Sequence, residues 1–305
     1  MSLYGLLKRP GPNGFGYNST TEQVTEGLDL SGRVYVLTGC NSGLGAETMR
    51  VLCARGATVM GLARSLKKAE AACAAVAGDA RPVACELSEP ASVRQAVETL
   101  RGANHDFDGV FSNAGIMALP QREVKYGLEL QVLTNHVGHF ILVTGLLDRL
   151  SPTGRVVMLS SAAHTMSWPE GVRMDDLAAE KDYQSWKAYG QSKLCNLLFA
   201  RSLAARLPEG QTANAVHPGV IATNLGRHTP KVFYALFGAL GPVMALKSVA
   251  QGAATQTFVA THPTAAGITG EYWADCNVAR SSAHGRDMAL AEALWEKTEA
   301  IVAGL

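Results

Sequence analysis

The chain has 305 residues, and 47% of them are hydrophobic, which is enough to bury a large core in one or two domains. Its formal net charge of +1 gives no electrostatic reason to expect binding to nucleic acid or to an anionic membrane surface. The six cysteines form no C-x-x-C pair and the N-terminus lacks a continuous apolar stretch, so we expect reduced thiols, no signal peptide and a cytoplasmic protein.

Short apolar runs typical of buried strands alternate along the chain with segments of helical periodicity. Residues 1–30, rich in Gly, Pro and polar side chains, are predicted to form an irregular arm before a single domain over 31–305. The alternation predicts an α/β fold with one doubly wound parallel sheet, helices on both faces, and ligands at the carboxyl ends of the strands. Strands are predicted at 33–38, 57–63, 81–85, 108–112, 155–160, 212–216 and 270–274. Helices are predicted at 43–55, 65–77, 89–101, 124–149, 184–207 and 285–303, with Ser65 and Ser88 as N-caps.

A glycine-rich turn follows the first predicted strand and leads into a helix. Its sequence is Thr38-Gly39-Cys40-Asn41-Ser42-Gly43-Leu44-Gly45. Glycines let a ligand approach the backbone closely, and the free N–H groups and dipole of a helix N-terminus bind phosphate. The turn therefore predicts a dinucleotide phosphate site, with a surface turn that merely needs glycine as the alternative.

The end of the second predicted strand bears on the choice of cofactor. NAD-specific sites usually have a carboxylate here to bind the ribose 2′-hydroxyl. This chain has Ala63 and then Arg64, with Lys67 and Lys68 one turn further on. A guanidinium suits a 2′-phosphate, so NADP(H) is favoured and NAD(H) remains open. A solvated helix start is the alternative role for Arg64.

A serine, a tyrosine and a lysine are spaced as a candidate proton-transfer site. Tyr189 and Lys193 are one helical turn apart, and Ser161 ends an earlier apolar run. A nearby ammonium favours the charged form of a phenol, whose ordinary pKa is about 10. A serine hydroxyl at a strand end could orient a carbonyl oxygen toward that phenol.

Together these motifs resemble the short-chain dehydrogenase/reductase family over nearly all of residues 30–305. Further matches are 112–115, similar to the family's Asn-Asn-Ala-Gly element, Asn135 in 133–140, and the nicotinamide-side loop at 217–223. The segments 161–164 and 192–196 look most like the retinol-dehydrogenase and WW-domain-oxidoreductase branch.

The resemblance implies a Rossmann-like catalytic domain over 31–305 that transfers hydride between nicotinamide C4 and a carbonyl carbon. Tyr189 would be the general acid in reduction and the base in oxidation. Lys193 would lower the tyrosine pKa and hold the nicotinamide ribose, while Ser161 would position the carbonyl oxygen. Asn135 would kink its helix and use its backbone carbonyl to hold a water beside Lys193. The implied cofactor-binding residues are Gly39, Asn41, Ser42, Leu44, Gly45, Arg64, Glu86, Leu87, Asn113, Ala114, Gly115, Tyr189, Lys193, Pro218, Gly219, Val220 and Thr223.

Two positions depart from the family pattern. Glu86 stands where the family usually has Asp, and Ser42 stands where NADP-preferring relatives often have a basic residue. His136 and His139 could suggest a metal, but no third ligand is suitably spaced, so we expect none.

Two segments are expected to shape the substrate pocket. The first, 164–187, contains Trp168, and the second, 232–246, is apolar and contains Phe233 and Phe237. Gly and Pro interrupt the second segment, which is too short to span a bilayer, so we expect a lid over 225–246, with membrane-surface contact as the alternative. Ser161, Tyr189 and these aromatic residues predict a bulky apolar ketone, aldehyde or alcohol as substrate.

Other function classes stay open. A nucleotide-binding redox sensor would lack catalysis, but such relatives typically lack the Tyr or Lys that this chain keeps. A nucleotide-sugar epimerase would have a differently spaced glycine loop, and an NAD-dependent alcohol dehydrogenase or a homodimer remains compatible with the sequence.

Overall fold

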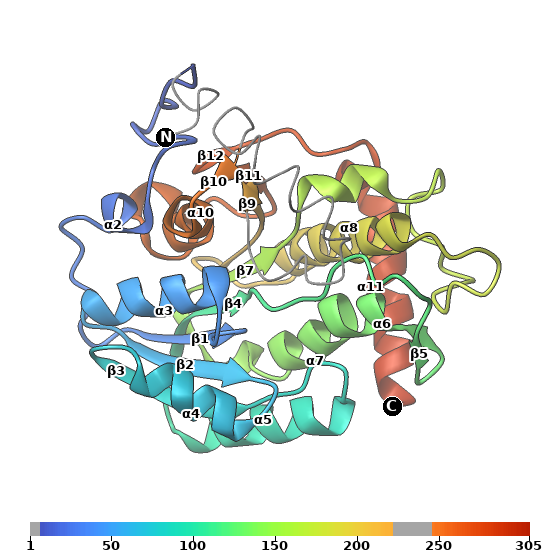
Figure 1. The fold of residues 1–305 in the computed structure, drawn as a ribbon, viewed down its shortest axis with the longest axis horizontal. Coiled ribbons are helices and arrows are strands. Elements are labelled where there is room, and N and C mark those ends of the chain that lie inside the picture. The colour runs from blue at the N-terminus through green and yellow to red at the C-terminus, as the bar shows by residue number, and fades with distance from the viewer. Residues whose placement is uncertain (1–6, 222–245) are drawn as a thin grey trace.

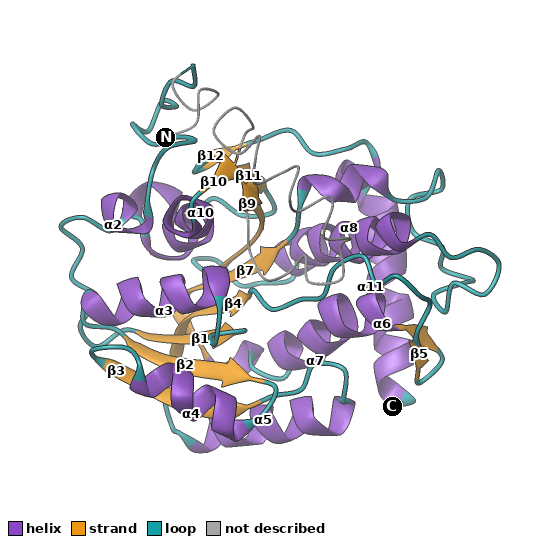
Figure 2. Cartoon of the chain, in the orientation of Figure 1, coloured by secondary structure: helices purple, strands orange, loops and turns teal. Residues whose placement is uncertain are grey.

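One eight-stranded sheet forms the centre of the protein (Figures 1 and 2). The computed structural model describes residues 7–221 and 246–305. The strand order is β12-β11-β8-β7-β4-β1-β2-β3, and every neighbouring pair is parallel except β11 with β12. The strands are β1 Val34–Thr38, β2 Thr58–Ala63, β3 Asp79–Ala84, β4 Phe107–Ser112, β7 Leu150–Leu159, β8 Thr212–His217, β11 Tyr272–Ala274 and β12 Asn277–Val278. The predicted fold, a doubly wound parallel sheet, is confirmed.

Helices cover both faces of this sheet, as the alternating pattern predicts. Side chains of successive strand residues point to opposite faces, so Val34 and Val36 pack in one hydrophobic cluster and Tyr35 and Leu37 in the other. The first cluster is covered by α5 Pro90–Gly102, α7 Gly138–Thr144, α8 Ser185–Ala204 and α11 Met288–Ala303. The second is covered by α3 Gly43–Ala54, α4 Leu66–Ala74 and α10 Val249–Thr261. No helix in the described ranges has the length and apolar character needed to cross a bilayer.

The predicted helix 124–149 is wrong at its start. Residues 124–129 form a hairpin of β5 Val124–Lys125 and β6 Leu128–Glu129 instead. Both turn residues, Tyr126 and Gly127, have positive φ, which suits the tight turn between two antiparallel strands. The remaining helix is α6 Leu130–Val132, the π-helix η1 Leu133–Val137 and α7, followed by the 3₁₀ turn η2 Leu147–Arg149.

Two other helix predictions need correction. Ser65 does precede α4, but Ser88 is not the cap of α5, because Glu89 holds that position and Pro90 begins the helix. Helix α10 was not predicted. Nine of its residues are buried, so it lacks the polar face that marks a surface helix in the sequence.

The described part of the N-terminal arm lies along α3 and α10 (Figure 1). It contains one short helix, α2 Thr21–Val24, whose Thr20 and Gln23 form a capping box. The Phe15 ring packs edge-on against Phe258 at 5.4 Å between centroids, and Val24 is fully buried. The arm is thereby attached to the two helices that flank the glycine-rich turn.

Candidate active site

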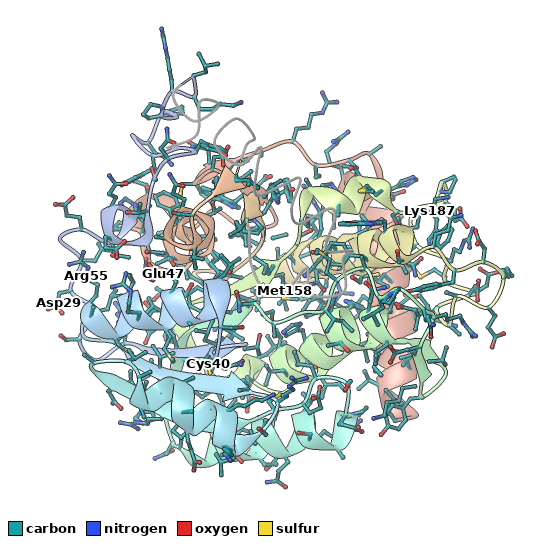
Figure 3. The ribbon with its side chains drawn as sticks, viewed as in Figure 1. Asp29, Cys40, Glu47, Arg55, Met158 and Lys187 are labelled. Carbon is teal, nitrogen blue, oxygen red and sulfur yellow. The ribbon has the colours of Figure 1, made fainter. Side chains whose placement is uncertain are left out.

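Ser161, Tyr189 and Lys193 come together at the carboxyl end of β7. Ser161 follows that strand and caps the 3₁₀ turn η3 Ala162–Met166, where its hydroxyl accepts a hydrogen bond from the Ala163 N–H at 3.1 Å. Tyr189 and Lys193 lie one turn apart on α8, and both are buried. The Lys193 ammonium nitrogen is 5.8 Å from the centroid of the Tyr189 ring. Figure 3 shows Met158, in the strand that leads to Ser161, in the interior and Lys187, near the start of α8, at the edge.

Burial dominates the electrostatics of this group. It raises the pKa of Tyr189 to about 12, although hydrogen bonding from Ser161 acts in the opposite direction. It lowers the pKa of Lys193 to about 7, while the amine donates to the Leu159 carbonyl at 2.9 Å. The expected lowering of the Tyr189 pKa by Lys193 is therefore not what the structure has. A lysine with a pKa near 7 is only partly charged at neutral pH, so it opposes the desolvation of the phenol weakly.

Asn135 lies in the π-helix η1, and its side-chain amide is occupied by protein groups. Nδ2 donates to the Ile116 carbonyl and the Ser192 hydroxyl, each at 2.9 Å, and Oδ1 accepts from the Ile116 N–H at 2.8 Å. A Cβ added to Gly115 would lie 3.0 Å from Asn135 Oδ1 and 3.4 Å from Lys193 Nζ. Asn135, Gly115 and Lys193 therefore adjoin one another, and only the main chain of Asn135 is available to a ligand.

The glycine-rich turn has the features of an anion site. Gly39 and Gly43 have positive φ, and a Cβ on Gly45 would lie 2.1 Å from the Gly39 carbonyl oxygen, so only glycine fits there. Ser42 caps α3 without using its side chain, and Asn41 and Ser42 are exposed. The first N–H groups of α3 thus face an open loop, which suits the phosphates of a dinucleotide.

Asn113 locks the end of β4 to the end of β1. Its backbone N–H and the next one, of Ala114, both donate to Thr38 Oγ1, at 2.9 and 3.0 Å, and its Nδ2 donates to the Thr38 carbonyl at 2.8 Å. Gln256 of α10 donates to Asn113 Oδ1 at 3.2 Å. Gln256 was not predicted, because only the packing of α10 brings it here. The Asn113 side chain holds the two loops in register, and Ala114 and Gly115 line the loop beyond it.

The residues expected near the adenosine half of the cofactor differ in their exposure and in the hydrogen bonds and ion pairs that they form. Arg64 is exposed and forms no ion pair with any described residue, and Ala63 before it is buried. One oxygen of Glu86 accepts from the N–H and hydroxyl of Ser88, at 3.2 and 2.9 Å. Leu87 is buried beneath η1 and α7. Arg64 therefore has the freest charged head group at this strand end.

Two histidines that the sequence did not single out hold the backbone on either side of Ser161. His164 Nδ1 lies 2.6 Å from the Ser161 carbonyl oxygen, and its Nε2 accepts from the Ser282 N–H at 3.1 Å. His217 Nδ1 accepts from the Ala162 N–H at 3.1 Å. Burial lowers the pKa of both rings, that of His217 to about 4, so both are neutral at physiological pH.

The loop after β8 carries Pro218, Gly219 and Val220. The short strand β9 Val220–Ile221 pairs with β10 Leu246–Lys247. Lys247, which was not predicted, is buried, pairs with Asp275 at 2.6 Å and packs its stem beside Gly219. Thr223, Phe233, Phe237 and the expected lid up to residue 245 lie outside the described residues.

The two tryptophans of segment 164–187 have different surroundings. Trp168 is 2% exposed, and the Arg173 guanidinium lies 3.4 Å from its ring centroid. Trp186 is 41% exposed, and its ring meets the Tyr189 ring edge-on at 6.1 Å. The structure thus places Trp186 against the Tyr189 ring and buries Trp168 under Arg173, and contact of Trp168 with substrate stays a prediction.

His136 and His139 do not point to a metal. His136 Nε2 lies 3.0 Å from the Thr298 hydroxyl. Across residues 7–221 and 246–305, no three His, Cys, Asp or Glu side chains are grouped to hold an ion.

Comparison with known proteins agrees with this geometry. The family model described as short chain dehydrogenase matches residues 33–231. The short-chain dehydrogenase TIC 32 B, chloroplastic, of Brassica napus is 39% identical, with 97% of each chain covered. Retinol dehydrogenase 12 of Mus musculus is 37% identical over 89% of this chain and 86% of its own. WW domain-containing oxidoreductase of Gallus gallus is 33% identical over 97% of this chain and 74% of its own.

Solved structures give the same result. An uncharacterized protein from Mycobacterium Paratuberculosis superposes with a TM-score of 0.75 and 32% identity, over 94% of this chain and 98% of its own. A blue fluorescent protein from a metagenomic library, solved in complex with NADPH, superposes with a TM-score of 0.64 and 26% identity, over 81% of this chain and 97% of its own. The resemblance seen in the sequence motifs is thereby confirmed, and the chain belongs to the short-chain dehydrogenase family of oxidoreductases.

Proposed function

We propose that this protein is an NADP(H)-dependent oxidoreductase that reduces bulky apolar aldehydes or ketones, or oxidises the matching alcohols. The observation that carries the proposal is the buried Tyr189 beside Ser161 and Lys193 at the end of β7. Ligands of doubly wound sheets bind at this edge, so the phenol and the glycine-rich turn open onto the same side of the molecule.

Tyr189 supplies the proton in the proposed reduction. With its pKa raised to about 12, the phenol is almost fully protonated at neutral pH, which is the form that donates to a carbonyl oxygen. The Ser161 hydroxyl orients that oxygen, and Lys193 adjoins the phenol and holds the ribose. Bound NADPH supplies the hydride. Use of NADPH as the hydride donor favours reduction as the working direction.

The preference for NADP(H) rests on charge at the end of β2. Arg64 is exposed, Lys67 and Lys68 follow on the exposed face of α4, and no carboxylate stands at the strand end. A guanidinium binds a 2′-phosphate through paired hydrogen bonds, whereas an acidic residue would repel it. The NADPH complex of the metagenomic protein supports the same choice.

Apolar substrates are supported by the residues near the phenol. Two large apolar side chains here are exposed: Met166 at the end of η3, which follows Ser161, and Trp186 one turn before Tyr189 on α8. Similarity to retinol dehydrogenase 12 points to the same class of alcohol or aldehyde.

All six cysteines are buried and unpaired, which supports a reducing compartment such as the cytoplasm.

A cofactor-paired screen tests this proposal. NADPH oxidation is followed with a panel of apolar aldehydes and ketones, a panel of sugars, and NADH in parallel. We expect turnover with apolar carbonyls and NADPH. Binding of NADPH without turnover of any carbonyl would favour the redox-sensor alternative. Equal rates with NADH and NADPH would contradict the proposed role of Arg64 in selecting NADP(H).

A further inference from the structure

The His139 side chain links the π-helix of Asn135 to the glycine-rich turn. Its Nδ1 lies 2.9 Å from the backbone carbonyl oxygen of Asn135, and its Nε2 lies 2.9 Å from the Thr38 hydroxyl. His139 is fully buried. One contact is with Asn135, whose side chain adjoins Gly115 and Lys193, and the other is where the glycine-rich turn begins.

The hydrogen-bond directions in this link follow from chemistry. A carbonyl oxygen can only accept, so His139 Nδ1 must carry the proton. Burial lowers the pKa of His139 to about 4, with a smaller contribution from the nearby charge of Lys193, so the ring is neutral and Nε2 can only accept. The Thr38 hydroxyl has two acceptors within reach, His139 Nε2 at 2.9 Å and the Phe111 carbonyl at 3.2 Å, and its proton points to the nearer one, Nε2. Thr38 in turn accepts from the N–H groups of Asn113 and Ala114. The hydrogen bonds therefore run in one direction from the end of β4 to the Asn135 carbonyl.

This link matters because the Asn135 side chain is already occupied. Its amide bonds to Ile116 and Ser192, which leaves the backbone carbonyl as the part of Asn135 that can serve the reaction. In a π turn the normal helical pairing of carbonyls is disrupted, so such an oxygen needs another group to fix it. His139 Nδ1 supplies such a group for the Asn135 carbonyl oxygen.

We propose that His139 is a positioning residue that holds the Asn135 carbonyl beside Lys193 and ties it through Thr38 to the cofactor loop. The inference rests on the proposed reductase function for its kinetic consequence. The neighbouring His136 bonds to Thr298 on α11 instead, so the two histidines have separate surroundings. His139 acts through Asn135 and needs no contact with substrate or cofactor.

Three substitutions separate the hydrogen bond from packing. His139→Asn keeps an amide donor close to the position of Nδ1, and His139→Gln keeps one close to the position of Nε2. His139→Leu keeps the approximate volume and neither polar contact. We expect kcat to fall about tenfold or more in His139→Gln and His139→Leu, and to stay within about threefold of the wild type in His139→Asn. The Kd for NADPH, which also reports folding, should change less than about twofold in all three.

The proposal is overturned if His139→Asn loses as much kcat as His139→Leu, or if His139→Gln keeps the wild-type kcat. A second measurement does not depend on any substrate. Nitrogen-15 NMR of the histidine-labelled protein should show His139 neutral with its proton on Nδ1, and a proton on Nε2 would contradict the link. Failure of the wild-type protein to turn over any carbonyl would reject the proposed function, whereas the NMR result would still decide the placement of His139.

Discussion

Hydrogen bonding from Ser161 lowers the pKa of Tyr189, yet burial outweighs this effect and raises that pKa to about 12. Lys193, one turn further along α8, has its own pKa lowered to about 7 by the same burial. The protein therefore holds a protonated phenol and a partly neutral amine in one apolar site. Burying these two ionisable groups costs stability, as functional sites often do.

Lys193→Met is expected to stabilise the cofactor-free protein at neutral pH. The unfolded lysine has a pKa near 10.5 and the folded one near 7, so between these values the unfolded chain binds the additional proton and stability rises with pH. The free energy of unfolding of Lys193→Met should exceed that of the wild type by about 1–3 kcal/mol below pH 7, a range that allows for the lost hydrogen bond to Leu159. This difference should vanish above pH 10.5.

Urea unfolding at pH 6, 8 and 10 measures this difference. Lys187→Met on the same helix is the matched control, because Lys187 is partly exposed and should give no such pH trend. A gain that is equal at all three pH values would mean that Lys193 is not held partly neutral in the folded protein.

Arg64→Ala is expected to weaken NADP(H) binding by about 10-fold to 100-fold and NAD(H) binding by less than about twofold. The reason is that, in the proposed site, the exposed Arg64 guanidinium at the end of β2 would bond the 2′-phosphate, which NAD(H) lacks, and charge-assisted hydrogen bonds contribute about 1.5–3 kcal/mol. Fluorescence titration with both cofactors measures the two losses. Lys297→Ala, at an exposed position on α11, serves as a control for general surface charge, and similar losses for the two cofactors in Arg64→Ala would reject the assignment.

Trp186→Ala is expected to raise KM for large apolar carbonyls about fivefold or more and to leave KM for small ones nearly unchanged. Trp186 is half-exposed beside Tyr189, so a large substrate can bury part of its ring. Trp186→Phe should retain most of the effect. Steady-state kinetics with a series of aldehydes of increasing length provides the test. A KM change that does not depend on substrate size would show that Trp186 does not line the substrate pocket.

Trp168→Phe should instead lower the melting temperature with little change in KM. Trp168 is buried under Arg173 and makes a further cation–π contact with Lys187 at 5.0 Å. A large KM effect of this substitution would instead support the prediction that Trp168 contacts substrate. Thermal unfolding and the same aldehyde series measure both effects.

The strands and most helices could be predicted because their signals are local. Alternation of apolar and polar segments locates the parallel units, and glycine at positions 39, 43 and 45 marks the turn after β1. The hairpin at 124–129 was missed because a helical pattern runs through it and only Tyr126 and Gly127 indicate a turn. Helix α10 was missed because it is buried nearly all round.

The parts of the site that escaped prediction depend on contacts between distant segments. His164 reaches Ser282, His217 reaches Ala162 and Lys247 reaches Asp275, and no spacing rule links these pairs. The direction of the Tyr189 pKa was also mispredicted, since a sequence reveals the neighbouring lysine but not the depth of burial. Patterns locate functional groups, whereas packing decides their protonation.

The central claim is that Tyr189 is the proton donor, and Tyr189→Phe tests it most directly. NADPH oxidation with the best apolar carbonyl is measured for both proteins at saturating substrate, together with the Kd for NADPH. Because the phenol is the proton donor in the proposed site, we expect kcat to fall by a factor of about 100 or more while the Kd changes less than about threefold. If Tyr189→Phe keeps more than about a tenth of the wild-type kcat, another group donates the proton and the assignment is wrong.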